Sequence, residues 1–242
     1  MDLEHSPTIP FALRVWRVWR SRGTRYLLHK TLRRSLAGRP DWKRRLVYAD
    51  PRGYWTLRGG PDYFREQEDH PSRTERSAWI ADRIASYRPT SILEVGCGYG
   101  KQLRLLRERL PDVPLFGVDF SPTQLAQARH YLADCAGVSL AMASGLRLPF
   151  ADGAFDLVLT SAVILHNPPA AAETIRREVV RTTRRLAAHN EDTDASYNRY
   201  GYDTAEWYRS AGIPVIEAGP IDVPTDPDRD VSQFCAAEPW RR

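Results

Sequence analysis

Three glycines at alternating positions, Gly96, Gly98 and Gly100, follow a short apolar run and precede a helical pattern. Glycines let the backbone turn sharply and approach a ligand closely, and the N-terminus of the following helix favours a carboxylate. The spacing is GxGxG and not the GxGxxG of dinucleotide-binding proteins, and Glu94 stands two positions before the first glycine. The segment therefore predicts a turn that binds a small molecule.

A second carboxylate follows about twenty residues later. Asp119 ends the apolar run 113–119, where its side chain can accept hydrogen bonds from both hydroxyls of a ribose. Together, the glycine turn and Asp119 resemble the first two motifs of the class I S-adenosylmethionine-dependent methyltransferases (type 11/25-like). Residues 148–158, LPFADGAFDLV, are similar to that family's LPF-x-D-x-x-FD-x-V segment. The resemblance covers roughly residues 75–242.

The resemblance implies an α/β fold, namely a doubly wound, Rossmann-like sheet of seven strands whose last strand is antiparallel. It also implies S-adenosyl-L-methionine as the cofactor. The family commonly has an aspartate that holds the adenine amine at the position of Ser144, and a serine hydroxyl accepts that bond more weakly. The implied cofactor-binding residues are Glu94, Gly96, Gly98, Gly100, Asp119, Phe120, Ser144, Gly145 and Ser161.

His166 follows the expected fourth strand, at the edge of the sheet where open α/β folds bind ligands. The family often has a histidine there. An alcohol acceptor needs its proton removed, and a positioned histidine can remove it as a general base. The other interpretation is a hydrogen-bonded residue that caps the next helix.

A polar cluster, His189-Asn190-Glu191-Asp192, follows the expected fifth strand and is predicted to face the same crevice as His166. Adjacent acidic residues there resemble the ligands of magnesium-dependent sugar O-methyltransferases, which predicts a Mg2+ site at Glu191 and Asp192. Those enzymes also have an acidic residue where this chain has Val163, so direct hydrogen bonding of a polyol is the preferred interpretation. The third interpretation of these residues is a solvated polar loop. The predicted acceptor-side residues are Glu191, as a second catalytic group, with His189, Asn190, Arg199, Tyr200 and Tyr202.

These residues predict an S-adenosylmethionine-dependent O-methyltransferase for a sugar, an oligosaccharide or a glycosylated metabolite. The 32 arginines against 3 lysines suggest an actinobacterial-type genome, in which small methyltransferases of similar build modify methylmannose polysaccharides. One alternative is a methyltransferase for a small aromatic or lipid acceptor at a membrane surface. Another is a non-catalytic cofactor-binding module of a modifying complex.

Short apolar runs alternate with helical patterns from Ser91 onward, as in a parallel sheet built from βαβ units. A capping box at Ser121-Pro122-Thr123-Gln124 predicts the start of one helix. A helix at about 74–87 precedes the first strand, and a short one covers 202–211. The predicted strands are 91–95, 113–119, 137–142, 155–161, 184–190, 213–221 and 232–237.

The first 75 residues are predicted to form a basic helical extension that covers the active site of a domain spanning 76–242. Residues 1–50 hold twelve Arg or Lys against four acidic residues, and 11–22 form an amphipathic, cationic helix. Residues 54–73 are predicted to be a loop-rich cover, in which Tyr63, Phe64, His70 and Arg73 could lie over the cofactor. For the helix at 11–22 we favour a packing role or a homodimer contact, then peripheral contact with an anionic membrane, and last a nucleic-acid arm.

Cysteine usage and the N-terminal composition predict a cytoplasmic protein. Cys97, Cys135 and Cys235 form no CxxC pair, which argues against a disulfide framework and a zinc site. Residues 1–10 are polar and acidic, and no apolar run approaches the ~20 residues of a membrane span.

Overall fold

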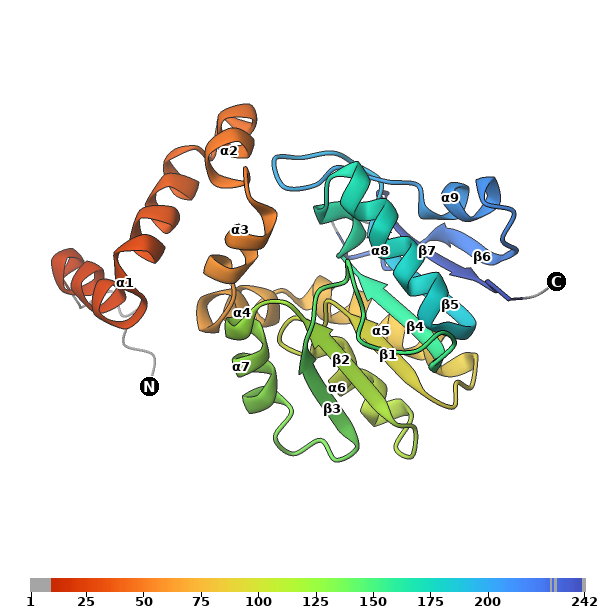
Figure 1. The fold of residues 1–242 in the computed structure, drawn as a ribbon. Coiled ribbons are helices and arrows are strands. Elements are labelled where there is room, and N and C mark those ends of the chain that lie inside the picture. The colour runs from red at the N-terminus through yellow and green to blue at the C-terminus, as the bar shows by residue number, and fades with distance from the viewer. Residues whose placement is uncertain (1–9, 227, 229, 241–242) are drawn as a thin grey trace.

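A computed structural model describes residues 10–226, 228 and 230–240. Its centre is a seven-stranded sheet with the order β3-β2-β1-β4-β5-β7-β6 (Figure 1). Neighbouring strands are parallel except for β7, which is antiparallel to both β5 and β6. The seven predicted strands and the antiparallel last strand are confirmed. The strands are β1 (Ile92–Val95), β2 (Leu115–Asp119), β3 (Val138–Met142), β4 (Phe155–Ser161), β5 (Thr183–Asp192), β6 (Val215–Pro220) and β7 (Ser232–Ala237).

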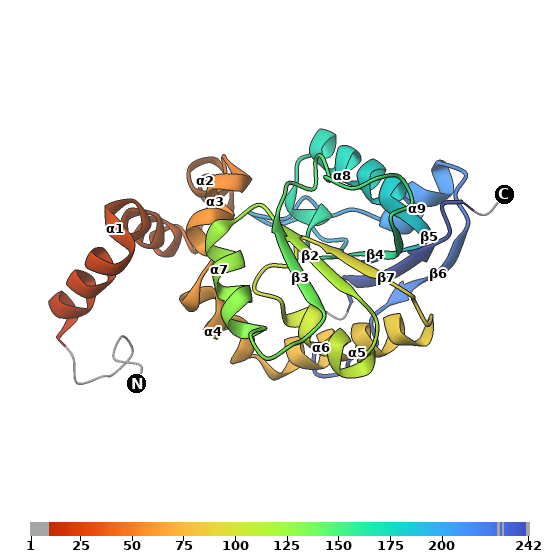
Figure 2. The ribbon, with the colours of Figure 1, turned by 60° about the horizontal axis from the view of Figure 1, so that its bottom comes forward.

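Helices cover both faces of the sheet, as a parallel sheet requires (Figure 2). One face packs on α5 (Pro71–Ser86), α6 (Lys101–Arg109) and α7 (Pro122–Tyr131). The other packs on α8 (Pro169–Thr182) and α9 (Thr204–Ser210). Alternate strand residues supply the two cores, so Ile92 joins the first and Leu93 the second.

The helix start predicted at Ser121 to Gln124 is confirmed. The Ser121 side chain accepts a hydrogen bond from the Gln124 backbone amide at 3.3 Å, and Pro122 occupies the first turn of α7. A single turn of 3-10 helix, Ile164–His166, follows β4 and precedes α8. This turn carries the predicted catalytic histidine to the carboxyl edge of the sheet.

The prediction of a loop-rich segment at 54–73 is wrong, because this part of the chain is helical. After α1 (Phe11–Ser35) come α2 (Pro40–Val47), α3 (Pro51–Arg58) and α4 (Pro61–Glu68). Each of the helices α2 to α5 begins with a proline, whose fixed φ suits the first helical position. The prolines at about ten-residue spacing were the signal for this run of short helices.

The cationic helix predicted at 11–22 is confirmed and is part of a longer element. Gly23 interrupts α1 with a φ of 78°, a conformation that favours glycine, and the helix then continues to Ser35. In Figures 1 and 2, α1 stands apart from the sheet, while α3 and α4 lie beside α7. Within the described residues, no helix has the length and apolar character needed to cross a membrane.

Candidate active site

The predicted glycine turn joins β1 to α6 at the centre of the sheet. Gly96 has a φ of 74°, and a Cβ there would collide with the side chain of Val163. Gly100 has a φ of 90° at the N-cap of α6, and a Cβ there would lie 2.5 Å from Leu132 Cδ1. A side chain at either position would be strained. Glycine at both positions therefore lets the backbone of the turn come close to a ligand above it.

A cavity of about 280 Å³ lies above this turn. The ends of β1, β2 and β4 form its floor, and α3 and α4 contribute to its wall through Trp55 and Tyr63. Gly100 caps α6 beside the cavity and does not line it. The predicted site residues that line it are Glu94, Gly96, Gly98, Asp119, Phe120, Ser144, Gly145, Ser161 and His166.

Two buried carboxylates, Glu94 and Asp119, line the cavity at the turn. Oε2 of Glu94 is buried without a hydrogen-bond partner, and burial, reinforced by Asp119, raises the Glu94 pKa to about 8. Asp119 accepts hydrogen bonds from the Gly98 amide at 3.0 Å and the Ser121 amide at 2.8 Å. Burial raises its pKa as well, and these amides oppose that shift. An orphaned carboxylate oxygen and a second carboxylate at the strand end fit a ligand that brings an ammonium group and ribose hydroxyls.

His166 also lines the cavity and has a defined tautomer. Its Nδ1 is 2.6 Å from the backbone oxygen of Asn198. Because a carbonyl can only accept, Nδ1 carries the proton and Nε2 keeps the lone pair. Burial lowers the His166 pKa to about 4, so the ring is neutral at physiological pH. Nε2 is the ring atom that can accept a proton while the Asn198 carbonyl holds the ring, and the lowered pKa makes it a weaker base than a free imidazole.

The expectation that residues 189–192 lie after the fifth strand and all face the crevice is wrong. β5 extends through Asp192, and successive residues of a strand point to opposite faces. His189 is fully buried between Thr160 Oγ1, 2.8 Å from Nδ1, and Tyr208 Oη, 2.7 Å from Nε2. Burial lowers its pKa to about 3. The Asn190 amide donates to Ser161 Oγ at 2.8 Å, and its Oδ1 is buried without a partner. None of the four lines the cavity.

Glu191 binds the backbone of the turn that carries His166. Its carboxylate accepts from the amides of Val163 and Leu165 at 3.1 Å and from Thr160 Oγ1 at 2.7 Å. Burial raises its pKa to about 7, and these donors oppose the shift. The side chain therefore acts through the turn and does not reach the cavity lining.

The two candidate magnesium ligands point to different surroundings. Asp192 accepts from Ser232 Oγ at 2.6 Å and pairs with Arg199 at 2.8 Å, whereas Glu191 binds the turn. Among the described residues, no group of three or more His, Cys, Asp and Glu could hold a metal ion. The prediction of a Mg2+ site finds no support in this geometry.

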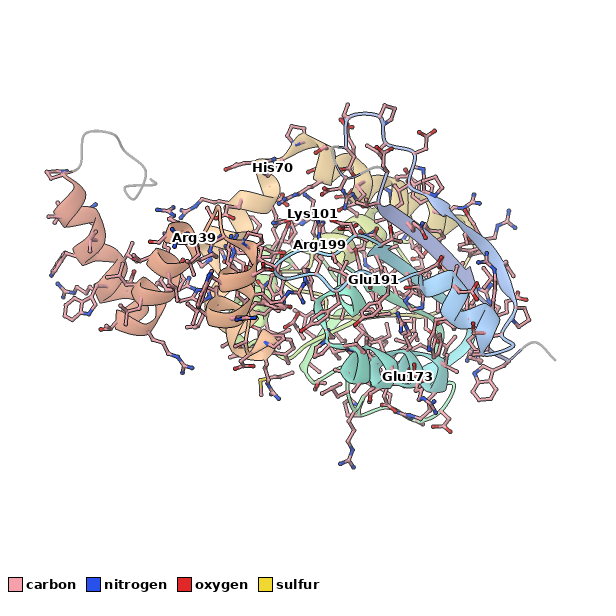
Figure 3. All side chains as sticks on the ribbon, turned by 90° about the horizontal axis from the view of Figure 1, so that it is seen from above. Arg39, His70, Lys101, Glu173, Glu191 and Arg199 are labelled. Carbon is pink, nitrogen blue, oxygen red and sulfur yellow. The ribbon has the colours of Figure 1, made fainter. Side chains whose placement is uncertain are left out.

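Three further predicted acceptor residues lie in the loop 193–203 and outside the cavity lining. Arg199 bridges Asp192 and Asp194, and the Tyr200 amide donates to the Leu165 carbonyl at 2.7 Å. Tyr202 Oη donates to the Asn167 carbonyl at 2.8 Å. The Tyr200 and Tyr202 contacts fasten the loop to the segment that follows β4, and Arg199 fastens it to the end of β5. In Figure 3, Arg199 and Glu191 lie near each other in the centre of the view.

Sequence reasoning missed two aromatic residues next to His166. The Trp55 ring lies 4.7 Å from the His166 ring, and Tyr48 Oη donates to the His166 carbonyl at 2.5 Å. Of the four residues expected to cover the cofactor, Tyr63 lines the cavity and Phe64, His70 and Arg73 do not. No local motif marks Tyr48 or Trp55, because their role depends on contact with a residue more than a hundred positions away.

Comparisons with known proteins agree with the fold and with the glycine turn. Residues 92–185 match the family model described as a methyltransferase domain. Trans-aconitate 2-methyltransferase of Klebsiella pneumoniae is 41% identical over 63 residues, 26% of this chain and 25% of that protein. Demethylmenaquinone methyltransferase of Thermus thermophilus is 42% identical over 72 residues, 29% of this chain and 32% of that protein. The chain thus matches about a quarter to a third of the length of these curated relatives.

The crystal structure of N-methyltransferase NodS from Bradyrhizobium japonicum WM9 with S-adenosyl-L-homocysteine has the same fold. Its TM-score is 0.60 at 17% identity, and the match covers 72% of this chain and 90% of that one. Residues 92–185 thus match a methyltransferase domain, and the sheet as a whole has the fold of a structure of an S-adenosylhomocysteine-binding methyltransferase. The matched domain spans β1 to the start of β5 and includes the glycine turn, Asp119 and His166.

Proposed function

We propose that this chain transfers the methyl group of S-adenosylmethionine to a hydroxyl oxygen of a small-molecule or oligosaccharide acceptor. The observation that carries the proposal is the position of the His166 ring at the cavity, where its Nδ1 donates to the Asn198 carbonyl at 2.6 Å. That ring leaves Nε2 free to accept a proton. An alcohol needs such a base because its pKa lies far above neutrality.

The remaining lining residues would hold the cofactor. Glu94 has a buried oxygen without a partner, which suits the ammonium of the methionine part. Asp119 at the end of β2 suits the ribose hydroxyls, and Phe120, Ser144 and Gly145 lie beside it for the adenine. The bound cofactor would supply the methyl group on a positively charged sulfur.

In the proposed reaction, Nε2 of His166 takes the hydroxyl proton as the acceptor oxygen attacks the methyl carbon. The carbon–oxygen bond forms, the carbon–sulfur bond breaks, and S-adenosylhomocysteine leaves with the electron pair. The cavity walls hold the two reactants in line and exclude water, and proximity of this kind can account for much of the barrier reduction. Glu191 supports the step indirectly, because it fixes the backbone of the turn at 163–165.

A hydroxyl-rich ring, such as a sugar, is the acceptor class we propose. Trp55 and Tyr63 line the cavity, and Trp55 also contacts His166. Their rings offer flat apolar surfaces on which an acceptor ring can lie with a hydroxyl near His166. The polar cluster at 189–192 no longer supports this class, since its side chains lie outside the cavity lining.

The test is transfer of label from methyl-tritiated S-adenosylmethionine to a panel of mannose oligosaccharides, phenols and carboxylic acids that includes trans-aconitate. We expect label in an oligosaccharide as a methyl ether, which survives mild alkali. A methyl ester, which alkali hydrolyses, would overturn the hydroxyl acceptor, since a carboxylate needs no general base. Label confined to phenols would overturn the sugar class. No transfer to any acceptor, with S-adenosylhomocysteine bound, would overturn the proposed activity.

A further inference from the structure

The N-terminal arm, which we define as residues 10–47, concentrates the positive charge of the chain. It holds twelve Arg and Lys residues but a single acidic residue, Asp41. The whole chain has 35 basic and 30 acidic residues, so the part outside the arm carries more acidic than basic side chains. Figure 1 shows α1, the main element of the arm, projecting away from the sheet. Positive charge is therefore concentrated on the arm, and the rest of the chain carries a net negative charge.

One side of the arm is fastened to the rest of the molecule through its cations. Arg22 donates to the Gly59 carbonyl at 2.6 Å, and Lys30 pairs with Asp62 at 2.8 Å. Arg44, on α2, donates to two carbonyls of the loop that follows β5. These contacts leave the opposite side of each helix facing outward.

The outward side presents large apolar side chains. Leu28 and Leu32 are four residues apart, as are Trp42 and Leu46, so each pair lies on one side of its helix. The exposed fractions are Leu13 39%, Trp16 45%, Trp19 48%, Leu28 65%, Leu32 37%, Trp42 54% and Leu46 55%. Seven of the eleven large apolar residues that are exposed in the described chain thus belong to the arm.

Arginines without carboxylate partners lie among these apolar residues. The guanidinium of Arg20 lies 5.2 Å from the centre of the Trp16 ring, and that of Arg45 lies 6.0 Å from Trp42. Figure 3 shows another, Arg39, on the arm. Within the described part of the chain, no carboxylate forms an ion pair with Arg17, Arg20, Arg25, Arg34, Arg39 or Arg45.

We propose that the outward side of the arm binds the surface of an anionic lipid membrane. Tryptophan and leucine side chains enter the interfacial region of a bilayer, and arginines extend to its phosphates. The acidic excess outside the arm would turn the sheet domain away from the same surface. Exposed leucines have no partner on a nucleic-acid backbone, and two arms of like charge would repel each other. The proposal does not depend on the proposed methyl transfer.

The test is flotation of the full chain with vesicles of phosphatidylcholine alone or of phosphatidylcholine with phosphatidylglycerol. We expect binding to the anionic vesicles that weakens as salt is raised. Because each cation near the surface contributes about 1 kcal/mol, the double variant Arg25→Gln/Arg34→Gln is expected to lower partitioning about thirtyfold. The variant Trp16→Ala/Trp19→Ala is expected to weaken binding to a similar extent.

The matched control is Trp240→Ala/Arg209→Gln, since Trp240 is 54% exposed and both residues lie outside the arm. This variant is expected to float like the wild type. Retained S-adenosylhomocysteine binding and an unchanged circular dichroism spectrum establish that each variant is folded. Equal binding to neutral vesicles, no binding to anionic vesicles, or equal loss in the control would overturn the proposal. Concentration-dependent dimers lost in the arm variants would assign the surface to a second copy, and binding of duplex DNA without lipid binding would assign it to nucleic acid.

Discussion

We call the glycine turn and the surroundings of His166 the two ends of the cavity, and they are built in different ways. At the glycine turn, residues 94–99 and Asp119 line the cavity, and the ends of the adjacent strands β1 and β2 hold them together. At the other end, His166 contacts Tyr48 and Trp55 from the N-terminal helical region and Asn198 from the loop that follows β5. The first end is encoded locally and can be read as a motif. The second end exists only after the N-terminal helices have packed against the loop that follows β5.

This difference predicts that variants at the two ends affect different measurements. A change at the glycine turn is expected to weaken cofactor binding, whereas a change around His166 is expected to slow methyl transfer with cofactor binding retained. A variant that lowers cofactor affinity and the rate of methyl transfer equally would show that the two ends act as one unit.

The largest expected effect is on turnover in His166→Ala. Loss of a general base lowers the rate by roughly 10²–10⁴-fold. Initial rates of label transfer, measured beside calorimetric titration with S-adenosylhomocysteine, should show this loss with the Kd unchanged. His130→Ala is the control, because His130 is exposed on α7. Turnover near that of the wild type in His166→Ala would remove the general base from the mechanism.

The next effect is on cofactor binding in Asp119→Ala. Loss of charge-assisted hydrogen bonds to the ribose is expected to weaken S-adenosylhomocysteine binding by about 10²-fold, or ~3 kcal/mol. Titration calorimetry measures the change, with Asp112→Ala as a control on an exposed turn. Unchanged affinity would mean that the carboxylate serves only the Gly98 and Ser121 amides.

A third effect concerns pH and Glu94. The raised pKa of about 8 keeps this carboxyl largely protonated at pH 6, whereas an ammonium ligand favours its ionised form. Binding therefore releases a proton below pH 8, so affinity for S-adenosylhomocysteine should rise with pH, by up to about tenfold per unit between pH 6 and 8. Calorimetric titrations in buffers of different ionisation enthalpy would also measure the proton released on binding. The same slope in Glu94→Gln would assign the released proton to another group.

The smallest effect is expected for Tyr48→Phe. This change removes the hydrogen bond to the His166 carbonyl, a contact of about 1 kcal/mol, and is expected to slow transfer about fivefold without altering cofactor affinity. Tyr87→Phe offers a comparison, because the Tyr87 hydroxyl bonds to Glu217 away from the cavity. An equal loss of rate in both variants would point to general destabilisation and not to the position of His166.

The sequence by itself determined the sheet and the glycine turn with Asp119 at the neighbouring strand end. Glycines with positive φ, a carboxylate at a strand end and alternating apolar runs act over a few residues, so Gly96 and Asp119 could be recognised without a structure. Only tertiary structure decided which groups Glu191 contacts. A β5 that continues to Asp192 turns alternate residues to opposite faces, which directs Glu191 to the turn at 163–165 and Asp192 to Arg199. Such orientation follows from strand length and packing between distant segments, and neither quantity is contained in a local pattern.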